Sequence, residues 1–98
     1  MVEIIKSASF EHWFLKLKDR GAKARIQARI DRLALGNPGD TKPVRNGIYE
    51  LRIDCGPGYR VYYLQNKSLL IVLLIGGDKS SQDSDIEQAV ALANHWQE

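Results

Sequence analysis

The sequence predicts an α+β fold in which an antiparallel sheet carries an N-terminal helical hairpin on one face, followed by a C-terminal helix. Three features lead to this prediction: alternation of apolar and polar residues over 49–64, two helix-type apolar stripes between residues 10 and 33, and an uninterrupted apolar run over 69–75. A chain of 98 residues has room for one hydrophobic core. We therefore expect residues 1–98 to form a single domain.

The predicted sheet is built mainly from residues 49–75. Leu51 and Ile53 alternate with polar residues, and Val61 and Tyr63 repeat this period after the turn at 55–58. The run 69–75 has no polar position, which is typical of a strand that is covered on both faces and placed centrally. Residues 2–5 are expected to form a first strand. The glycines at 76 and 77 are expected to end the run with backbone freedom.

The helices are predicted from apolar residues at helical spacing. The first is capped by Ser7 or Ser9, the second begins at Ala22 after a break at 19–21, and the third begins at Ser84, which has capping-box spacing to Glu87. The three stripes are Phe10, Trp13, Phe14 and Leu17; Ala22, Ile26, Ile30 and Leu33; and Ile86, Ala89, Val90, Ala93 and Trp96. We interpret the first, aromatic stripe as core. The last stripe could dock on the body or on a partner.

Charge and hydropathy limit the classes of function. The net charge is +2, but residues 78–98 carry −4 and residues 1–77 carry +6, so the body could bind an anionic polymer or an acidic partner, or simply be solvated. The longest apolar run is far shorter than the ~20 residues of a membrane helix, and no secretory leader opens the chain. With a lone Cys55, these features favour a cytoplasmic protein without membrane contact.

Two arginines on adjacent strands are the first candidates for a binding site. If Leu51 and Val61 share the core face, Arg52 and Arg60 both project from the opposite face, where guanidinium groups match phosphate oxygens. Lys42 and Arg45 add cations near the start of the strand that carries Arg52, so we include both as candidate RNA contacts.

A basic ridge on the second helix is a weaker candidate. Arg25, Arg29 and Arg32 recur at i, i+4 and i+7, and Arg25 and Arg29 are included as candidate RNA contacts. The alternative is a solvated helix face that is partly paired with Asp31 or Asp19.

Several chemistries find no motif in the sequence. There is no phosphate-binding loop, no nucleophile elbow and no cysteine or histidine pattern for a metal, and the two histidines are far apart in sequence. We therefore expect neither a metal site nor a cofactor.

An ordered set of motifs carries a family resemblance. The segments are ELR at 50–52, GPGYRVYY at 56–63 and LLIGGDKSSQDSDI at 73–86. At these positions the chain resembles the RelE/ParE superfamily of toxin–antitoxin toxins, most closely its phage-derived, HigB-like addiction module killer branch. The resemblance implies a RelE-like fold and a cognate antitoxin, usually with a helix-turn-helix domain. RNA-cleaving members enter the ribosome and cut mRNA through the ribose 2′-hydroxyl, whereas ParE members inhibit DNA gyrase.

The resemblance also implies site residues. Arg52, Arg60 and Lys79 match the motif, with Tyr62 and Gln82 as weaker neighbours. Gln82 joins the candidate RNA contacts. Histidine, which some HigB-like nucleases use, is missing at these positions, so the general base stays open. Arg52 and Arg60 can stabilise a negative transition state, and Lys79 or Tyr62 can supply proton transfer.

Alternatives remain for the function and for single residues. The chain is an mRNA endonuclease, a non-catalytic gyrase inhibitor or an inactive remnant that only binds its antitoxin. Arg60 contacts RNA or pairs with Glu50 across the hairpin; in the first case Arg60→Ala abolishes toxicity and leaves the melting temperature almost unchanged. Lys79 transfers a proton, clamps a phosphate or takes no part.

Overall fold

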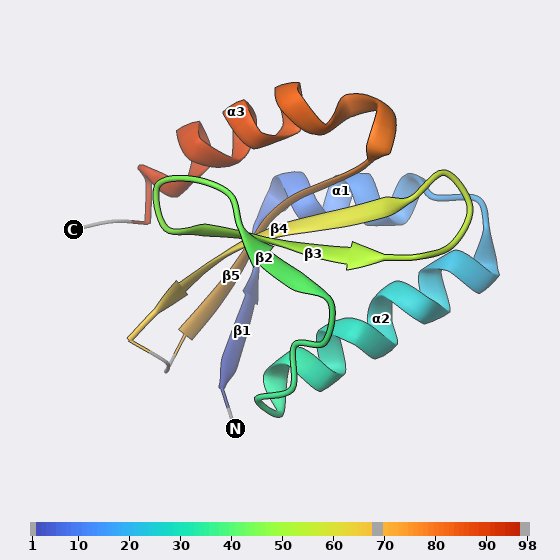
Figure 1. Ribbon diagram of the computed structural model, residues 1–98, viewed down its shortest axis with the longest axis horizontal. Helices are drawn as coiled ribbons and strands as arrows, with labels where there is room; N and C mark the ends of the chain where they lie inside the picture. The colour runs from blue at the N-terminus through green and yellow to red at the C-terminus, as the bar shows by residue number, and fades with distance from the viewer. Residues whose placement is uncertain (1, 68–69, 97–98) are drawn as a thin grey trace.

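The computed structural model describes residues 2–67 and 70–96. It contains five strands, three α-helices and one short 3-10 helix over these residues (Figure 1). Leu69, the first residue of the predicted apolar run, lies outside the described residues. In chain order the elements are β1 (Glu3–Lys6), α1 (Ala8–Lys16), α2 (Arg20–Ala34), β2 (Thr41–Pro43), β3 (Ile48–Ile53), β4 (Tyr59–Asn66), β5 (Leu70–Asp78), η1 (Lys79–Ser81) and α3 (Gln82–Ala93).

The strands form one sheet in the order β1-β5-β4-β3-β2. All neighbours are antiparallel except β1 and β5, which run parallel. The predicted α+β class is thus confirmed. One strand was not expected: β2 pairs with β3 through Thr41–Leu51, Lys42–Glu50 and Pro43–Tyr49, where the sequence indicated only a lead into the sheet. Such a short strand becomes visible only once its partner is placed beside it.

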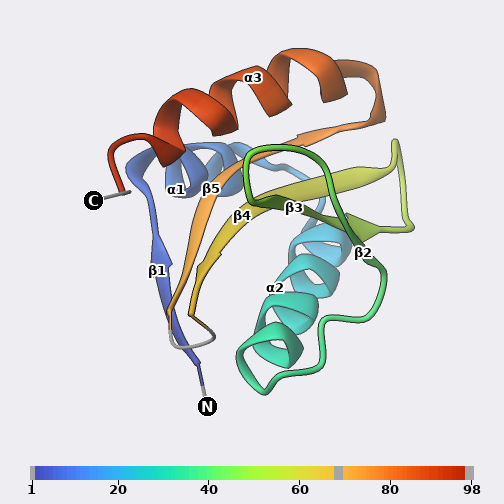
Figure 2. The same ribbon diagram turned by 60° about the vertical axis from the view of Figure 1, so that its left-hand side comes forward.

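Helices cover both faces of the sheet. Figures 1 and 2 show α2 along one side and α3 along the other. One core lies beneath α1 and α2 and includes Phe10, Ile26, Leu51 and Val61; the second lies beneath α3 and includes Ile48, Tyr62, Leu64, Val72, Leu74, Ala89 and Ala93. The buried stripes of the helical hairpin are therefore as predicted, and α3 docks on the body. Trp96, the last residue of the predicted α3 stripe, lies beyond the helix and is 39% exposed, so that part of the stripe was wrong.

Strand β5 lies inside the sheet and contributes to both cores, as its apolar run predicts. Gly76 and Gly77, however, belong to the strand and do not end it. Their role is close packing: a Cβ atom on Gly76 would overlap the Trp13 ring, and one on Gly77 would overlap the Asp85 carboxylate. The two glycines let helices on opposite faces approach the strand closely. The prediction that they end the strand through backbone freedom was therefore wrong.

The observed starts of α1 and α2 confirm one prediction and correct another. The Ser7 hydroxyl accepts a hydrogen bond from Phe10 N at 3.0 Å, so Ser7 is the cap of α1. The Asp19 side chain caps α2, which begins at Arg20, two residues before the expected start at Ala22.

Helix α3 also begins earlier than expected, at Gln82. The capping box in this segment belongs to Asp78 and Ser81, which enclose the 3-10 turn η1. Ser84 lies within α3, and its hydroxyl donates to Ser81 O. The Asp78 cap begins the helical turn directly at the end of β5, which leaves no room for a loop before α3.

Candidate functional site

An open hollow lies at the turn between β3 and β4. Figure 1 shows this turn at its right-hand side. Its volume is about 580 Å³. Three of the four side chains that the sequence proposes as catalytic contribute to it, namely Arg52, Arg60 and Lys79. The complete lining is Asp40, Arg52, Ile53, Asp54, Gly56, Pro57, Gly58, Arg60 and Lys79.

Strand register brings these cations together. Arg52 on β3 pairs directly with Arg60 on β4, so both side chains leave the same face of the sheet. Lys79 follows the last residue of β5, and its backbone N donates to Pro57 O at 3.4 Å. Gly58 in the turn has a φ of 81°, and a Cβ there would lie 2.7 Å from Arg60 Nη1. A glycine at this position lets the arginine cross the turn.

Arg52 stands at the open side of the hollow. Its Nη2 lies 3.0 Å from Asp40 Oδ1, and the two side chains are 37% and 53% exposed. An ion pair this exposed contributes only about 0–1 kcal/mol. An incoming phosphate could therefore displace Asp40 at little cost.

Arg29 supports the segment that carries Asp40. It donates hydrogen bonds to the carbonyl oxygens of Arg52, Pro38 and Asp40, the last two at 2.9 and 3.1 Å. The Arg29 guanidinium is therefore bonded to backbone carbonyl oxygens of this protein. The sequence had suggested that it contacts RNA. Arg25 is exposed on α2 and is not among the residues that line the hollow.

Arg60 is largely enclosed, with its side chain 13% exposed. Its Nη1 donates to Gly58 O, and its Nε lies 3.9 Å from Oε2 of Glu50. Glu50 is a buried carboxylate, 1% exposed, that also accepts hydrogen bonds from Tyr62 Oη and Gln82 Nε2, each at 3.1 Å. Arg60 thus lines the hollow and also faces Glu50. The predicted pairing with Glu50 is present, and contact with RNA stays a prediction.

Tyr62 lies beneath α3 and is fully buried. Burial, and after it the charge and hydrogen bond of Glu50, raise the pKa of the Tyr62 phenol well above its usual value of 10.0. At neutral pH the phenol therefore stays protonated, and its O–H donates a hydrogen bond to Glu50 Oε2. Tyr62 is not part of the hollow's lining, so its proposed catalytic part stays a prediction. Gln82 is likewise directed at Glu50.

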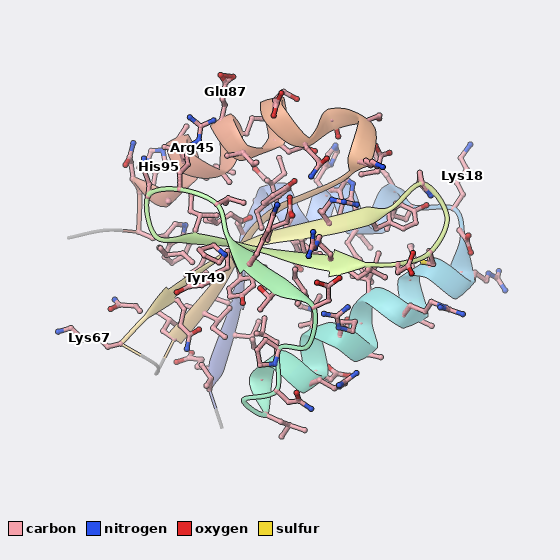
Figure 3. All side chains as sticks on the ribbon, viewed as in Figure 1. Lys18, Arg45, Tyr49, Lys67, Glu87 and His95 are labelled. Carbon is pink, nitrogen blue, oxygen red and sulfur yellow. The ribbon has the colours of Figure 1, made fainter. Side chains whose placement is uncertain are left out.

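Lys42 and Arg45 are exposed and are not among the residues that line the hollow. Arg45 belongs to the turn between β2 and β3, which Figures 1 and 2 place next to α3, and Figure 3 labels its side chain there. Ile48 and Arg52 are four positions apart along β3, or about 13 Å. The structure therefore separates Arg45 from Arg52, although both belong to the same hairpin region of the sequence.

Sequence reasoning missed the burial of Glu50. Simple alternation assigned it to a polar face, but the face also contains Ile48 on its own strand and Tyr62 and Leu64 on the next. These apolar neighbours indicate that the face is covered by a second layer, and the apolar stripe of α3 forms this layer.

Two negative findings concern the described part of the chain. Within residues 2–67 and 70–96, no group of three or more His, Cys, Asp or Glu side chains is placed to hold a metal ion. Over the same residues no helix combines the length and the apolar character needed to cross a membrane.

Comparison with known proteins first defines the fold. The chain resembles one from a toxin–antitoxin complex, RelBE2 of Mycobacterium tuberculosis, with a TM-score of 0.53 and 21% identity over 80% of this chain and 98% of that one. It therefore has the α+β fold of that protein. The family model of phage-derived protein Gp49-like (DUF891) matches residues 12–95. A protein of Haemophilus influenzae described as uncharacterized is 54% identical over 92 residues, which are 94% of this chain and 93% of the relative. The chain belongs to the phage-derived Gp49-like family.

Proposed function

We propose that this chain is the toxin of a type II toxin–antitoxin system, of the HigB-like branch, and that it cleaves mRNA on the ribosome. The observation that carries the proposal is the convergence of Arg52, Arg60 and Lys79 on one open hollow. Membership of a phage-derived family and a fold shared with a chain of a toxin–antitoxin complex support it.

The proposed reaction transfers the scissile phosphorus from one oxygen to another within the RNA. The ribose 2′-oxygen forms a bond to the adjacent phosphorus, the bond from phosphorus to the 5′-oxygen breaks, the 2′-hydroxyl loses its proton, and the 5′-oxygen gains one. The products are a 2′,3′-cyclic phosphate and a 5′-hydroxyl. Negative charge grows on the phosphorane oxygens during this step, and fixed cations stabilise it. We assign this task to Arg52 and Arg60, which both line the hollow.

Lys79 is exposed at the rim of the hollow, where it acts as a phosphate clamp. Transfer of a proton by Lys79 is the alternative, and a substitution that keeps its charge distinguishes the two. Tyr62 is buried beside Glu50, and its part in the reaction is indirect. Positioning of the RNA by the ribosome would supply much of the rate, because orientation alone can lower a barrier by several kcal/mol, up to about 10.

The partners follow from the same chemistry. We propose that Arg25, Lys42 and Arg45, all exposed, contact RNA outside the hollow. A cognate antitoxin, of helix-turn-helix type, would neutralise the toxin, and an acidic antitoxin segment would suit the cations of the hollow. Action on ribosomes places the protein in the cytoplasm.

The test is to induce the protein and map the ends of translated messages. Cut messages are expected from wild type, with losses of about 10²-fold or more in Arg52→Ala and Lys79→Ala. Lys67→Asn is the matched control: it removes a cation at the opposite end of the sheet, and Asn tolerates the φ of 51° (Figure 3). Intact messages with a DNA-damage response would instead identify a gyrase inhibitor. Undisturbed growth would identify an inactive remnant.

A further inference from the structure

Glu50 is a buried carboxylate that the proposed reaction does not use directly. It sits on β3, and its Oε2 accepts hydrogen bonds from Tyr62 of β4 and Gln82 of α3. Its Oε1 is buried and has no hydrogen-bond partner among the residues that the structure describes. A charged group in such a position is costly unless a countercharge faces it.

Arg60 supplies that countercharge. Its Nε lies 3.9 Å from Glu50 Oε2 and is itself buried without a hydrogen-bond partner in the described chain. At the other end of the guanidinium, Nη1 donates to Gly58 O. Because the guanidinium is planar and rigid, holding Nε and Nη1 also sets the direction of Nη2.

We propose that Glu50 is a positioning residue, which fixes the guanidinium plane of Arg60 so that its outer edge faces a phosphate in the hollow. Tyr62 and Gln82 hold the carboxylate by hydrogen bonds, the carboxylate attracts the guanidinium by its charge across 3.9 Å to Nε, and the Gly58 carbonyl accepts a hydrogen bond from Nη1. A cation fixed in advance stabilises developing charge without reorganising during the reaction. The phosphate is that of RNA only if the proposed function is right, whereas the orientation of Arg60 by Glu50 can be tested without it.

The first measurement is an NMR experiment on the purified protein. The substitution Glu50→Gln keeps the size of the side chain and an oxygen that accepts hydrogen bonds, but it removes the charge. The Nε–H signal of Arg60 is assigned with Arg60→Lys. It is expected to exchange with solvent at least ~10-fold more slowly than that of Arg52 in the wild type, because Arg60 Nε is buried, whereas Arg52 Nε, which donates to Asp40 Oδ1 at 3.2 Å, belongs to a side chain that is 37% exposed. In Glu50→Gln the Arg60 signal should shift and its exchange should accelerate by a similar factor.

Asp85→Asn is the matched control. Asp85 is a second buried carboxylate on the α3 side of the sheet, where it accepts a hydrogen bond from Ser81 Oγ at 2.6 Å. The same chemical change there should leave the exchange of the Arg60 Nε–H unaltered. A purely structural effect of losing a buried charge would act on Arg60 in both variants.

The second measurement is a double-mutant cycle in single-turnover cleavage at saturating toxin on programmed ribosomes. Glu50→Gln is expected to lower the rate about 10-fold or more when Arg60 is present and to have almost no further effect when Arg60 is alanine. Saturation removes differences in ribosome binding, so the rate reports the bound state.

Each outcome decides the proposal. The positioning role is overturned if the Arg60 Nε–H signal is unchanged in Glu50→Gln, or if this group exchanges as fast as that of Arg52 in the wild type. It is also overturned if Glu50→Gln lowers the cleavage rate by the same factor when Arg60 is alanine as when Arg60 is present. The wild-type comparison stands even if Glu50→Gln does not fold. If the wild type cuts no RNA, the proposed function is refuted but the positioning role is not. Titration with inorganic phosphate should then still shift the Arg60 Nε–H signal of the wild type, and should shift it less in Glu50→Gln. Equal shifts in both proteins would refute the positioning role.

Discussion

Replacement of Arg60 by alanine tests how the site is built into the fold. The expectation from sequence, an almost unchanged melting temperature, assumed an exposed side chain. The structure encloses Arg60, with 13% of the side chain exposed, against a Glu50 carboxylate that is 1% exposed. Arg60→Ala would leave that carboxylate buried without its countercharge, so we now expect a marked loss of stability.

The size of the loss can be bounded. Removing one partner of a buried ion pair costs about 3–5 kcal/mol. Glu50 keeps two hydrogen-bond donors, Tyr62 and Gln82, so we place the loss at or just below the lower end of that range, at about 2–3 kcal/mol. For a domain of this size that corresponds to a fall of roughly 10–20 °C in melting temperature. Arg52→Ala breaks only the exposed pair with Asp40 and should cost about 0–1 kcal/mol.

Thermal and urea unfolding of four proteins would check this reasoning: the wild type, Arg60→Ala, Arg52→Ala and the double variant Arg60→Ala with Glu50→Gln. The double variant should be more stable than Arg60→Ala alone, because it contains no unpaired buried charge. Equal melting temperatures for Arg60→Ala and Arg52→Ala would refute the buried pair. Loss of toxicity in Arg60→Ala is therefore informative only beside its stability.

Three further predictions concern other parts of the molecule. Gly76→Ala should destabilise the protein by about 1–3 kcal/mol in urea unfolding, because the new methyl group would overlap the Trp13 ring. Gly21→Ala is the control, since a methyl group there meets no atom closer than 3.4 Å and should not destabilise the protein in this way. Equal losses of stability in the two variants would show that Gly76 is not required for packing against Trp13. Burial raises the pKa of the Asp85 carboxyl above its usual value of 3.8. The folded state therefore binds a proton at Asp85 more readily than the unfolded chain does. As the pH rises from 3.8 through the raised pKa, Asp85 loses this proton and wild-type stability falls. The melting temperature of Asp85→Asn relative to wild type should then rise between about pH 3 and pH 7, and a constant difference would contradict the burial effect. Lys79→Arg should retain most single-turnover cleavage if Lys79 is a clamp, since arginine keeps its charge and its proton; loss of cleavage would show proton transfer.

The sequence by itself determined the features that depend on local periodicity. Alternation along β3 and β4 placed Arg52 and Arg60 on one face, and helical spacing identified the buried side of α2. The apolar run of β5 likewise predicted an interior strand. These conclusions hold because the side-chain direction repeats every 2 residues in a strand and every 3.6 in a helix, whatever lies opposite.

Only the tertiary structure decided what lies opposite those faces. Alternating residues look the same whether the polar face meets water or a second helix, so the burial of Glu50 and Tyr62 depended on where α3 docks. The closeness of Lys79 to the β3–β4 turn and the tight packing at Gly76 and Gly77 also join segments distant in the chain. Burial and contact are properties of the assembled layers, and the free energy of a charge depends on them, so neither can be read from the spacing of residues along one strand.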